Sequence, residues 1–423
     1  VKKNSPVPMA AISTSTDNDS DLALQSLLTA EAVRERCARI GTAAEAGRGR
    51  WFRYLPDRLE HCVDLVANEC RANYPDLEIP FHSRWRHFEI NGTDLWQHYR
   101  DNRLAEADRE VITRSAIDLV VLSVILDAGA GAAWTYRDPV TGSLLSRSEG
   151  LAAATIDLFF NTLARDDGEG GLMLDATAIS TVGDDEICRA FQHHSENPLL
   201  GMAGRIALLR SLGQRLTALR ASGFARPGHI YDRLLAANSG GQLPAGEILK
   251  LVLHCFNPIW PSGRSSGGVI LGDCGVHPLA DVGDACGGLV PFHKLSQWLS
   301  YSLIEPLSWA GLQVTEPDQL TGLPEYRNGG LLLDSGVLQP LDPDLYTNCL
   351  PLDHEAVVEW RALTVWLLDR VALGVRHYLG MEADDLPLAS VLQGGTWSAG
   401  RKLAAERRGG DPPLKLAIDG TVF

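Results

Sequence analysis

Two acidic residues stand among glycines, at places where a carboxylate could do acid–base chemistry. Asp273 lies within GDCGVHP (272–278), directly after the apolar run VIL, and Glu325 lies within PEYRNGG (324–330). Burial raises the pKa of a carboxyl group and a cationic neighbour lowers it, and either shift suits an acid, a base or a charge stabiliser. The alternatives are an Asx turn for Asp273 and a structural ion pair with an arginine for Glu325.

Polar and aromatic residues near these carboxylates could orient a small ligand. The two glycines after PEYR would let the backbone approach a bound molecule closely. A further segment, DAGAGAAWTYRDPVTGSLLSRSEG (127–150), joins aromatic residues to an Arg-Ser-Glu sequence, although Ser148 could simply cap the following helix. His293 is also explained as a buried histidine with satisfied hydrogen bonds. The residues that we predict to contact the ligand are Tyr326, Arg327, Asp334, His277, Trp134, Arg147, Glu149 and His293.

Arginines in two other segments could bind an anion. PFHSRWRHFEING (80–92) contains Arg84 and Arg86 among histidines and aromatics, and QGGTWSAGRK (393–402) brings Arg401 into the start of a helix. Guanidinium groups match phosphate oxygens in a bidentate way, and helix N-termini attract anions. We predict that these three arginines bind a phosphate group. Paired surface charges and ordinary helix capping are the alternatives, and the second segment lacks the P-loop pattern.

No metal-binding motif is found, and no Ser-His-Asp order is readable. The sequence contains no HExxH and no CxxC, and its eight cysteines are expected to be free thiols. We therefore predict that the protein uses no metal and no other cofactor.

The charge of the chain limits its partners. The net charge is -15, from 38 basic and 53 acidic residues, whereas nucleic-acid binders need a basic surface to replace phosphate counterions. No stretch approaches the ~20 apolar residues of a membrane span, and the first residues lack a signal-peptide core. We expect a cytoplasmic protein that acts on a small molecule and binds neither nucleic acid nor membrane.

Helical periodicity dominates the chain from about Asp21. Residues 1–20, rich in Ser, Thr, Asp and Asn, are predicted to form a flexible tail. Residues 21–423 are predicted to form one large helical catalytic region, and two helical lobes with the site between them are one arrangement of it. The predicted helices lie in 21–40, 55–74, 108–134, 149–164, 201–221, 245–256, 293–307, 354–379 and 399–408.

Strand patterns are few and short. PLKLAIDGTVF (413–423) alternates well enough for a strand or hairpin, and a short pair is predicted near LLLDSGVLQPL (331–341). The sequence shows no strand–helix alternation and no GxGxxG, so a doubly wound nucleotide-binding sheet is not expected. The unusual polar residues are predicted to lie on loops at 80–92, 127–150, 256–278, 320–336 and 393–402.

Several long segments carry a resemblance to one family. They are GDCGVHP (272–278), LVPFHKLSQWLSYSLIEPL (289–307), LTGLPEYRNGGLLLDSGVL (320–338), LQGGTWSAGRKLAAE (392–406) and LKLAIDGTVF (414–423), with DAGAGAAWTY and RSEG upstream. Roughly from residue 22 to the end, the chain resembles the uracil-catabolism family of fungi and bacteria. That family works beside a cyclohydrolase-like ring-opening enzyme, in a pathway that leads through a ribosylated urea towards urea.

A more distant resemblance bears on the fold and the mechanism. VILGD and the PEYRNGG block are similar to segments of queuosine-salvage nucleoside glycosidases, whose helical fold is related to the helix-hairpin-helix DNA glycosylases. This resemblance implies a mainly α fold of that kind with a few short strands. The glycosidases have an aspartate where this chain has Glu325, and Asp273 falls where they place another carboxylate.

Together the resemblances imply hydrolysis of the N-glycosidic bond of ribosylurea or its 5-phosphate. Bond cleavage builds positive charge on the sugar, which a carboxylate can stabilise while water attacks, and urea must be protonated to leave. Asp273 and Glu325 are the predicted catalytic pair. The alternatives are a non-catalytic partner of the ring-opening enzyme and an amidohydrolase that attacks the ureido group. The latter is disfavoured by the lack of a metal cluster or a readable nucleophile triad.

Overall fold

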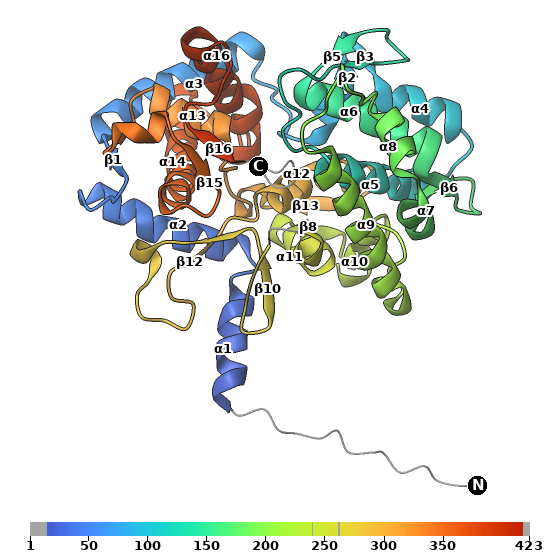
Figure 1. The fold of residues 1–423 in the computed structure, drawn as a ribbon, viewed down its shortest axis with the longest axis horizontal. Helices are drawn as coiled ribbons and strands as arrows, with labels where there is room; N and C mark the ends of the chain where they lie inside the picture. Colours follow the sequence, from blue (N-terminus) through green and yellow to red (C-terminus); the bar gives the residue numbers. More distant parts are fainter. Residues whose placement is uncertain (1–14, 239, 261–262, 418–423) are drawn as a thin grey trace.

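The computed structural model describes residues 15–238, 240–260 and 263–417, with side chains described from residue 21 onward. Figure 1 shows two groups of helices side by side, with the buried helix α12 (Lys294–Trp309) between them. The first group joins the beginning of the chain to its last third. It contains α2 (Ala30–Glu45), α3 (Leu59–Asn73), α13 (Tyr326–Asp334), α14 (Glu355–Leu379), α15 (Leu388–Val391) and α16 (Trp397–Arg408), and α1 (Ser15–Ser26) projects below it.

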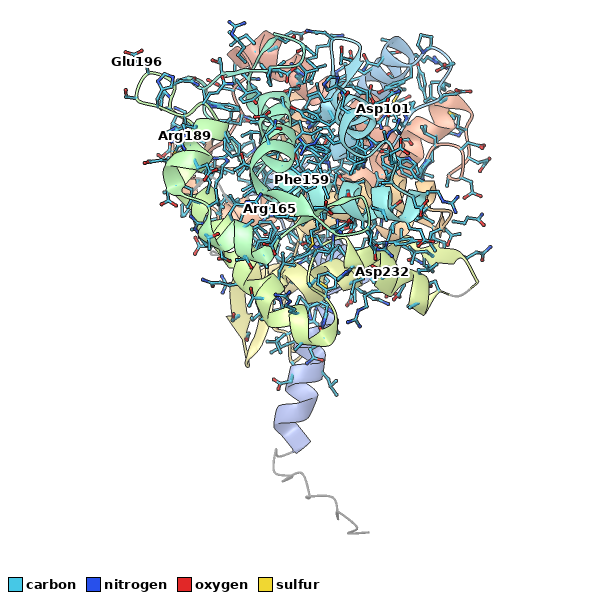
Figure 2. All side chains as sticks on the ribbon, turned by 90° about the vertical axis from the view of Figure 1, so that its right-hand side faces the viewer. Asp101, Phe159, Arg165, Arg189, Glu196 and Asp232 are labelled. Carbon is cyan, nitrogen blue, oxygen red and sulfur yellow. The ribbon has the colours of Figure 1, made fainter. Side chains whose placement is uncertain are left out.

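The second group is formed by the middle of the chain. Its helices are α4 (Leu95–Arg103), α5 (Arg109–Ile125), α6 (Arg147–Leu158), α7 (Ala176–Thr181), α8 (Asp184–Ala190), α9 (Met202–Leu219), α10 (His229–Ala237) and α11 (Ala245–Phe256). Figure 2 looks onto this group, with charged side chains such as Arg189 and Glu196 at its rim. Phe159, in the π-turn after α6, is fully buried. Apolar burial therefore holds the group together beneath a charged surface.

The prediction of a mainly α fold is confirmed, and each predicted helical segment contains a helix. α5 is buried on almost every side, as its uniformly apolar sequence indicates. The segment 21–40 divides into two helices at Thr29, whose hydroxyl accepts the backbone N–H of Ala32 at 3.1 Å and caps α2. α1 already begins at Ser15, so the predicted tail is wrong for residues 15–20, and residues 1–14 lie outside the described part of the chain.

The strands are short and pair in twos. β1 (Phe52–Tyr54) pairs with β14 (Leu338–Pro340) antiparallel, and β15 (Cys349–Pro351) pairs with β16 (Lys415–Ala417) parallel. The predicted C-terminal strand is thus confirmed for 415–417, while 418–423 lie outside the described residues. The pair predicted within 331–341 is wrong, because 331–334 are helical and β14 finds its partner far away in the sequence.

The other strands mostly form local hairpins. β11 (Cys274–Val276) and β12 (Leu289–Pro291) pair antiparallel just before α12, and β8 (Gln242–Pro244) and β13 (Gln313–Thr315) pair parallel. The remaining hairpins are β2 (Glu89–Ile90) with β3 (Thr93–Asp94), β4 (Tyr136–Arg137) with β5 (Leu144–Leu145), β6 (Ala164–Asp166) with β7 (Leu172–Leu174), and β9 (Arg264–Ser266) with β10 (Val269–Gly272). The likeness to DNA glycosylases stays a prediction. No helix among the described residues has the length and apolar character needed to cross a bilayer.

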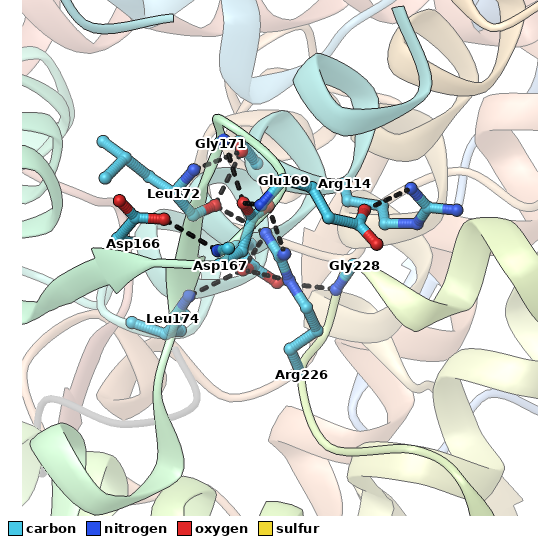
Figure 3. A network of polar contacts seen from close by, with 12 residues as sticks. Arg114, Asp166, Asp167, Glu169, Gly171, Leu172, Leu174, Arg226 and Gly228 are labelled. Atoms are coloured by element: carbon cyan, nitrogen blue, oxygen red, sulfur yellow. Dashed lines mark hydrogen bonds and ion pairs between the residues drawn. The ribbon is translucent and has the colours of Figure 1, made fainter. Parts of the chain in front are cut away.

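A buried polar network fixes α5 within the second group (Figure 3). The Asp118 carboxylate, in α5, is fully buried and accepts hydrogen bonds from Arg226 Nε at 2.9 Å and from the backbone N–H groups of Leu174 and Gly228 at 2.6 Å. Arg226 also contacts Asp167 at 3.2 Å. One carboxylate thus joins a helix, a hairpin and a loop.

We expect Asp118→Asn to lower the free energy of unfolding by about 3 kcal/mol, because Arg226 loses the closer of two buried charge partners and retains Asp167. Urea denaturation followed by circular dichroism measures this change. The matched control is Asp232→Asn, whose carboxylate is 37% exposed beside Arg114 and should contribute under about 1 kcal/mol. Equal losses in the two variants would contradict this role of Asp118.

Candidate active site

The first turns of three helices, α6, α12 and α13, meet α16 at a cluster of charged groups between the two groups of helices. Glu149 in α6 approaches Arg401 in α16 at 3.4 Å. The guanidinium of Arg327, in α13, lies 5.1 Å from the ring centre of Trp397, the first residue of α16. Helix N-termini carry partial positive charge, so this convergence favours negative groups.

Lys294, the first residue of α12, lies in the electrostatic field of three carboxylates. Burial lowers the pKa of Lys294, and the negative charge of Glu325, followed by that of Asp273 and Asp127, acts against this effect. The ammonium group therefore lies within the field of carboxylates from three distant segments. The periodicity of α12 suggested only a core helix, so its sequence did not reveal this role of Lys294.

Glu325 is the N-cap residue of α13. Its carboxylate accepts the backbone N–H groups of Arg327 at 2.8 Å and Asn328 at 2.7 Å. Burial nevertheless raises the pKa of Glu325.

The predicted loop at 320–336 is wrong from 326 to 334, where the chain forms the helix α13. The glycines of this helix permit close packing, since a Cβ on Gly329 would lie 2.6 Å from the Trp360 ring.

Asp273 is held in its ionised form. Its two oxygens face Arg361 Nη1 and Nη2 at 2.8 Å each, and one of them also accepts the backbone N–H of Lys294 at 3.0 Å. Burial opposes ionisation, but the Arg361 guanidinium and these hydrogen bonds hold the pKa of Asp273 below its ordinary value. A cavity of about 460 Å³ reaches this pair, and its other lining residues include Trp260, Arg264, Cys274 and Asp353.

Arg84 occupies the opposite side of the cluster. It is fully buried in the short helix η2 (Arg84–Phe88), and its Nη1 lies 2.7 Å from Asp127 Oδ1. Ser148 Oγ donates to the same carboxylate at 2.7 Å. The alternative that Ser148 caps the helix does not hold, because α6 begins at Arg147 and Ser146 occupies the cap position. Asp127 was missed from the sequence, although an acidic residue at the end of an apolar helix is a usable signal.

Two histidines and two tryptophans adjoin these charges. The His82 ring centre lies 6.2 Å from those of Trp298 and Trp397, and that of His87 lies 5.8 Å and 6.2 Å from them. Burial lowers the pKa of both histidines, and the charge of Arg84 lowers that of His87 further. Both imidazoles are therefore neutral at pH 7. The density of aromatic residues in 80–92 was the sequence signal for this region.

Of the remaining predicted residues, two lie close to the cluster. Tyr326 follows Glu325, and burial raises its pKa while Arg327 acts against this effect. Arg147 is exposed and has a positive φ of 55°, and its charge also acts on Tyr326. Five of the predicted residues contact protein groups elsewhere: Trp134 bonds Phe191 O, His277 contacts Glu359, His293 contacts Leu27 O, Asp334 pairs with Arg408, and Arg86 pairs with Glu305 and Glu89.

Comparisons with known proteins cover almost the whole chain. Residues 26–423 match the model of a family described as a protein of unknown function (DUF1688). Protein urg3 of Schizosaccharomyces pombe is 34% identical over 405 residues, which cover 94% of this chain and 98% of urg3. Uracil catabolism protein 4 of Lachancea kluyveri is 34% identical over 431 residues, which cover 92% and 97%. The predicted resemblance to uracil-catabolism proteins is confirmed, and the ribosylurea step stays a prediction.

The ion pair of Asp273 predicts a pH-dependent contribution to stability. Because its pKa is lowered on folding, the stabilisation is fully present above the unfolded pKa of about 4 and is lost as the pH falls through the folded pKa. The difference in unfolding free energy between wild type and Asp273→Asn should therefore be constant at neutral pH and shrink on acidification. Urea titrations between pH 7 and pH 3 measure it. The surface variant Asp101→Asn is the matched control, and a trend of equal size there would contradict the assignment.

Proposed function

The chain belongs to the DUF1688 family, and we propose that it acts in uracil catabolism by hydrolysing the N-glycosidic bond of ribosylurea or its 5-phosphate. The reaction releases urea and ribose or ribose 5-phosphate. The printed name of the relative from Lachancea kluyveri supports the pathway. The arrangement of carboxylates around Lys294 supports the chemistry.

One observation carries the proposal: two carboxylates near one ammonium group have pKa values shifted in opposite directions. Burial raises the pKa of Glu325, whereas Arg361 keeps that of Asp273 low. Such divergence is how an acid and a base are maintained together at one pH. Glu325 is thereby suited to give a proton, and Asp273 is suited to remain ionised.

The proposed step uses both carboxylates, as glycosidases do. Glu325 donates its proton to the urea nitrogen as the bond between that nitrogen and the sugar C1′ breaks. Asp273, which borders the cavity of about 460 Å³, orients a water molecule and accepts its proton as the oxygen bonds to C1′. Of the two carboxylates, Asp273 is the one that lines this cavity, and Glu325 is not among its lining residues. Tyr326 and Arg327 are proposed to orient the substrate.

The first test is incubation of the purified protein, without added metal, with ribosylurea and separately with its 5-phosphate. Urea should be released from at least one of them. Ammonia without urea would instead indicate attack on the ureido group by an amidohydrolase. A folded protein that releases neither product would overturn the glycosidase and favour the non-catalytic partner of the ring-opening enzyme.

The second test concerns the acid. Glu325→Gln keeps an acceptor for the α13 amides but has no carboxyl proton, so kcat should fall by about 10²–10⁴-fold. Because the acid must be protonated, wild-type kcat should decline as the pH rises through the raised pKa of Glu325. Asp101→Asn, at a surface carboxylate that is 56% exposed, should match wild type in both respects. An unchanged pH profile and rate in Glu325→Gln would sink the assignment.

A further inference from the structure

Three buried donors at the cluster have no hydrogen-bond partner among the described residues. They are Nη2 of Arg84, Nη1 of Arg327 and Nε1 of Trp298. The three side chains are between 0% and 6% exposed. A buried charged or polar donor without a partner is destabilising. Three such donors at one place are therefore explained by a ligand that accepts hydrogen bonds.

The three donors surround the same group of rings. The guanidinium carbon of Arg84 lies 5.6 Å from the Trp298 ring centre, and that of Arg327 lies 5.1 Å from the Trp397 ring centre. His87 bridges the two tryptophans, and its Nδ1 lies 3.2 Å from Arg84 Nη1. Trp298 is one helical turn after Lys294, on the same face of α12.

The cluster is positively charged within an acidic protein. Six cationic side chains meet four acidic ones, which leaves a local charge of +2, or of +3 when Glu325 is protonated, in a chain whose net charge is -15. The N-termini of α6, α12 and α13 add to the positive potential. The cations are Arg84, Arg147, Lys294, Arg327, Arg361 and Arg401, and the carboxylates are Asp127, Glu149, Asp273 and Glu325.

We infer that the cluster binds the 5-phosphate of the substrate, so that the protein acts on ribosylurea 5-phosphate rather than on ribosylurea. This inference rests on the proposed function, whose substrate it specifies. A phosphate dianion matches the excess charge of the cluster, and its three terminal oxygens can accept from donors in different directions. Arg84 and Arg327 supply the charged donors, and Trp298 supplies a neutral one.

This site differs in part from the arginines predicted from the sequence. Arg84 is retained. Arg86 is paired with Glu305 at 2.6 Å and with Glu89 at 3.0 Å. Arg401 is 51% exposed and lies at the rim beside Glu149. Arg327, predicted only as a general substrate contact, supplies the second charged donor.

Binding tests the site independently of catalysis. Titration calorimetry at fixed ionic strength should show that ribose 5-phosphate binds at least about tenfold more tightly than ribose, since each charge-assisted hydrogen bond contributes about 1.5–3 kcal/mol. Inorganic phosphate should compete with ribose 5-phosphate. Equal affinity for ribose and ribose 5-phosphate would overturn the phosphate site, whether or not the protein releases urea.

Kinetics test the substrate. The ratio of kcat/KM for ribosylurea 5-phosphate to that for ribosylurea should be about 100-fold in wild type. Trp298→Phe removes one donor while keeping an aromatic ring, and should lower the ratio by about tenfold. Arg327→Gln should lower it further. The control, Arg114→Gln, removes an arginine that pairs with Asp232 in the second group of helices and should leave the ratio unchanged.

The outcomes separate this inference from the proposed function. Urea released equally from both substrates would keep the glycosidase but overturn the phosphate specificity. Formation of ribose 1-phosphate from ribosylurea and added inorganic phosphate would assign the site to free phosphate as the nucleophile, which also overturns the inference. Release of urea from neither substrate would overturn the proposed function and with it the assigned substrate, and tight binding of ribose 5-phosphate would then support the anion site alone.

Discussion

The ion pair between Asp273 and Arg361 determines how the other charged groups of the cluster are placed. The Asp273 side chain binds the Lys294 amide, and its backbone oxygen accepts the amides of Phe292 at 2.9 Å and His293 at 3.2 Å. Asp273 thus fixes the start of α12, while Arg361 anchors the same residue to α14. The position of Lys294, and therefore the field at the other carboxylates, depends on this arrangement. Separation of such a pair would leave a buried charge without its partner, which is strongly destabilising, so the two side chains hold each other in place.

Most of the fold follows from periodic burial, and its exceptions have identifiable causes. Long apolar patterns predicted α9, α11 and α14 to within a few residues, whereas α5 begins where expected but ends at Ile125, nine residues before the predicted end. The segment that forms α13 was read as a loop, because two adjacent glycines each disfavour a helix by about 1 kcal/mol. The compensation is tertiary: the Glu325 cap satisfies the first amides, and Gly329 permits contact with Trp360. The pairing of β1 with β14 likewise depends on segments that are far apart in the sequence.

Site residues could be predicted where their neighbours in the sequence are unusual. They could not be predicted where their role depends on contacts with residues far away in the chain. Asp273 and Glu325 were recognised because a carboxylate among glycines beside apolar runs is locally unusual. Asp334 has similar surroundings, yet it forms a structural ion pair with Arg408, and no local feature separates the two cases. Arg361 was missed because its partner is 88 residues away in the chain, and its own helix resembles an ordinary core helix.

The opposing influences on Glu325 connect ligand binding to acid–base chemistry. Two backbone amides, Arg327 and Lys294 all favour its ionised form, and burial outweighs them. An anion that entered the cluster would add negative charge and would displace the water that screens these groups. Both changes raise the pKa of a carboxyl group. An anionic substrate would therefore strengthen the protonated state of the residue proposed to protonate its leaving group, whereas a neutral one would leave Glu325 closer to ionisation. The net negative charge of the chain opposes such a ligand only weakly at this range, since charges farther than about 8 Å through solvent are largely screened at physiological ionic strength.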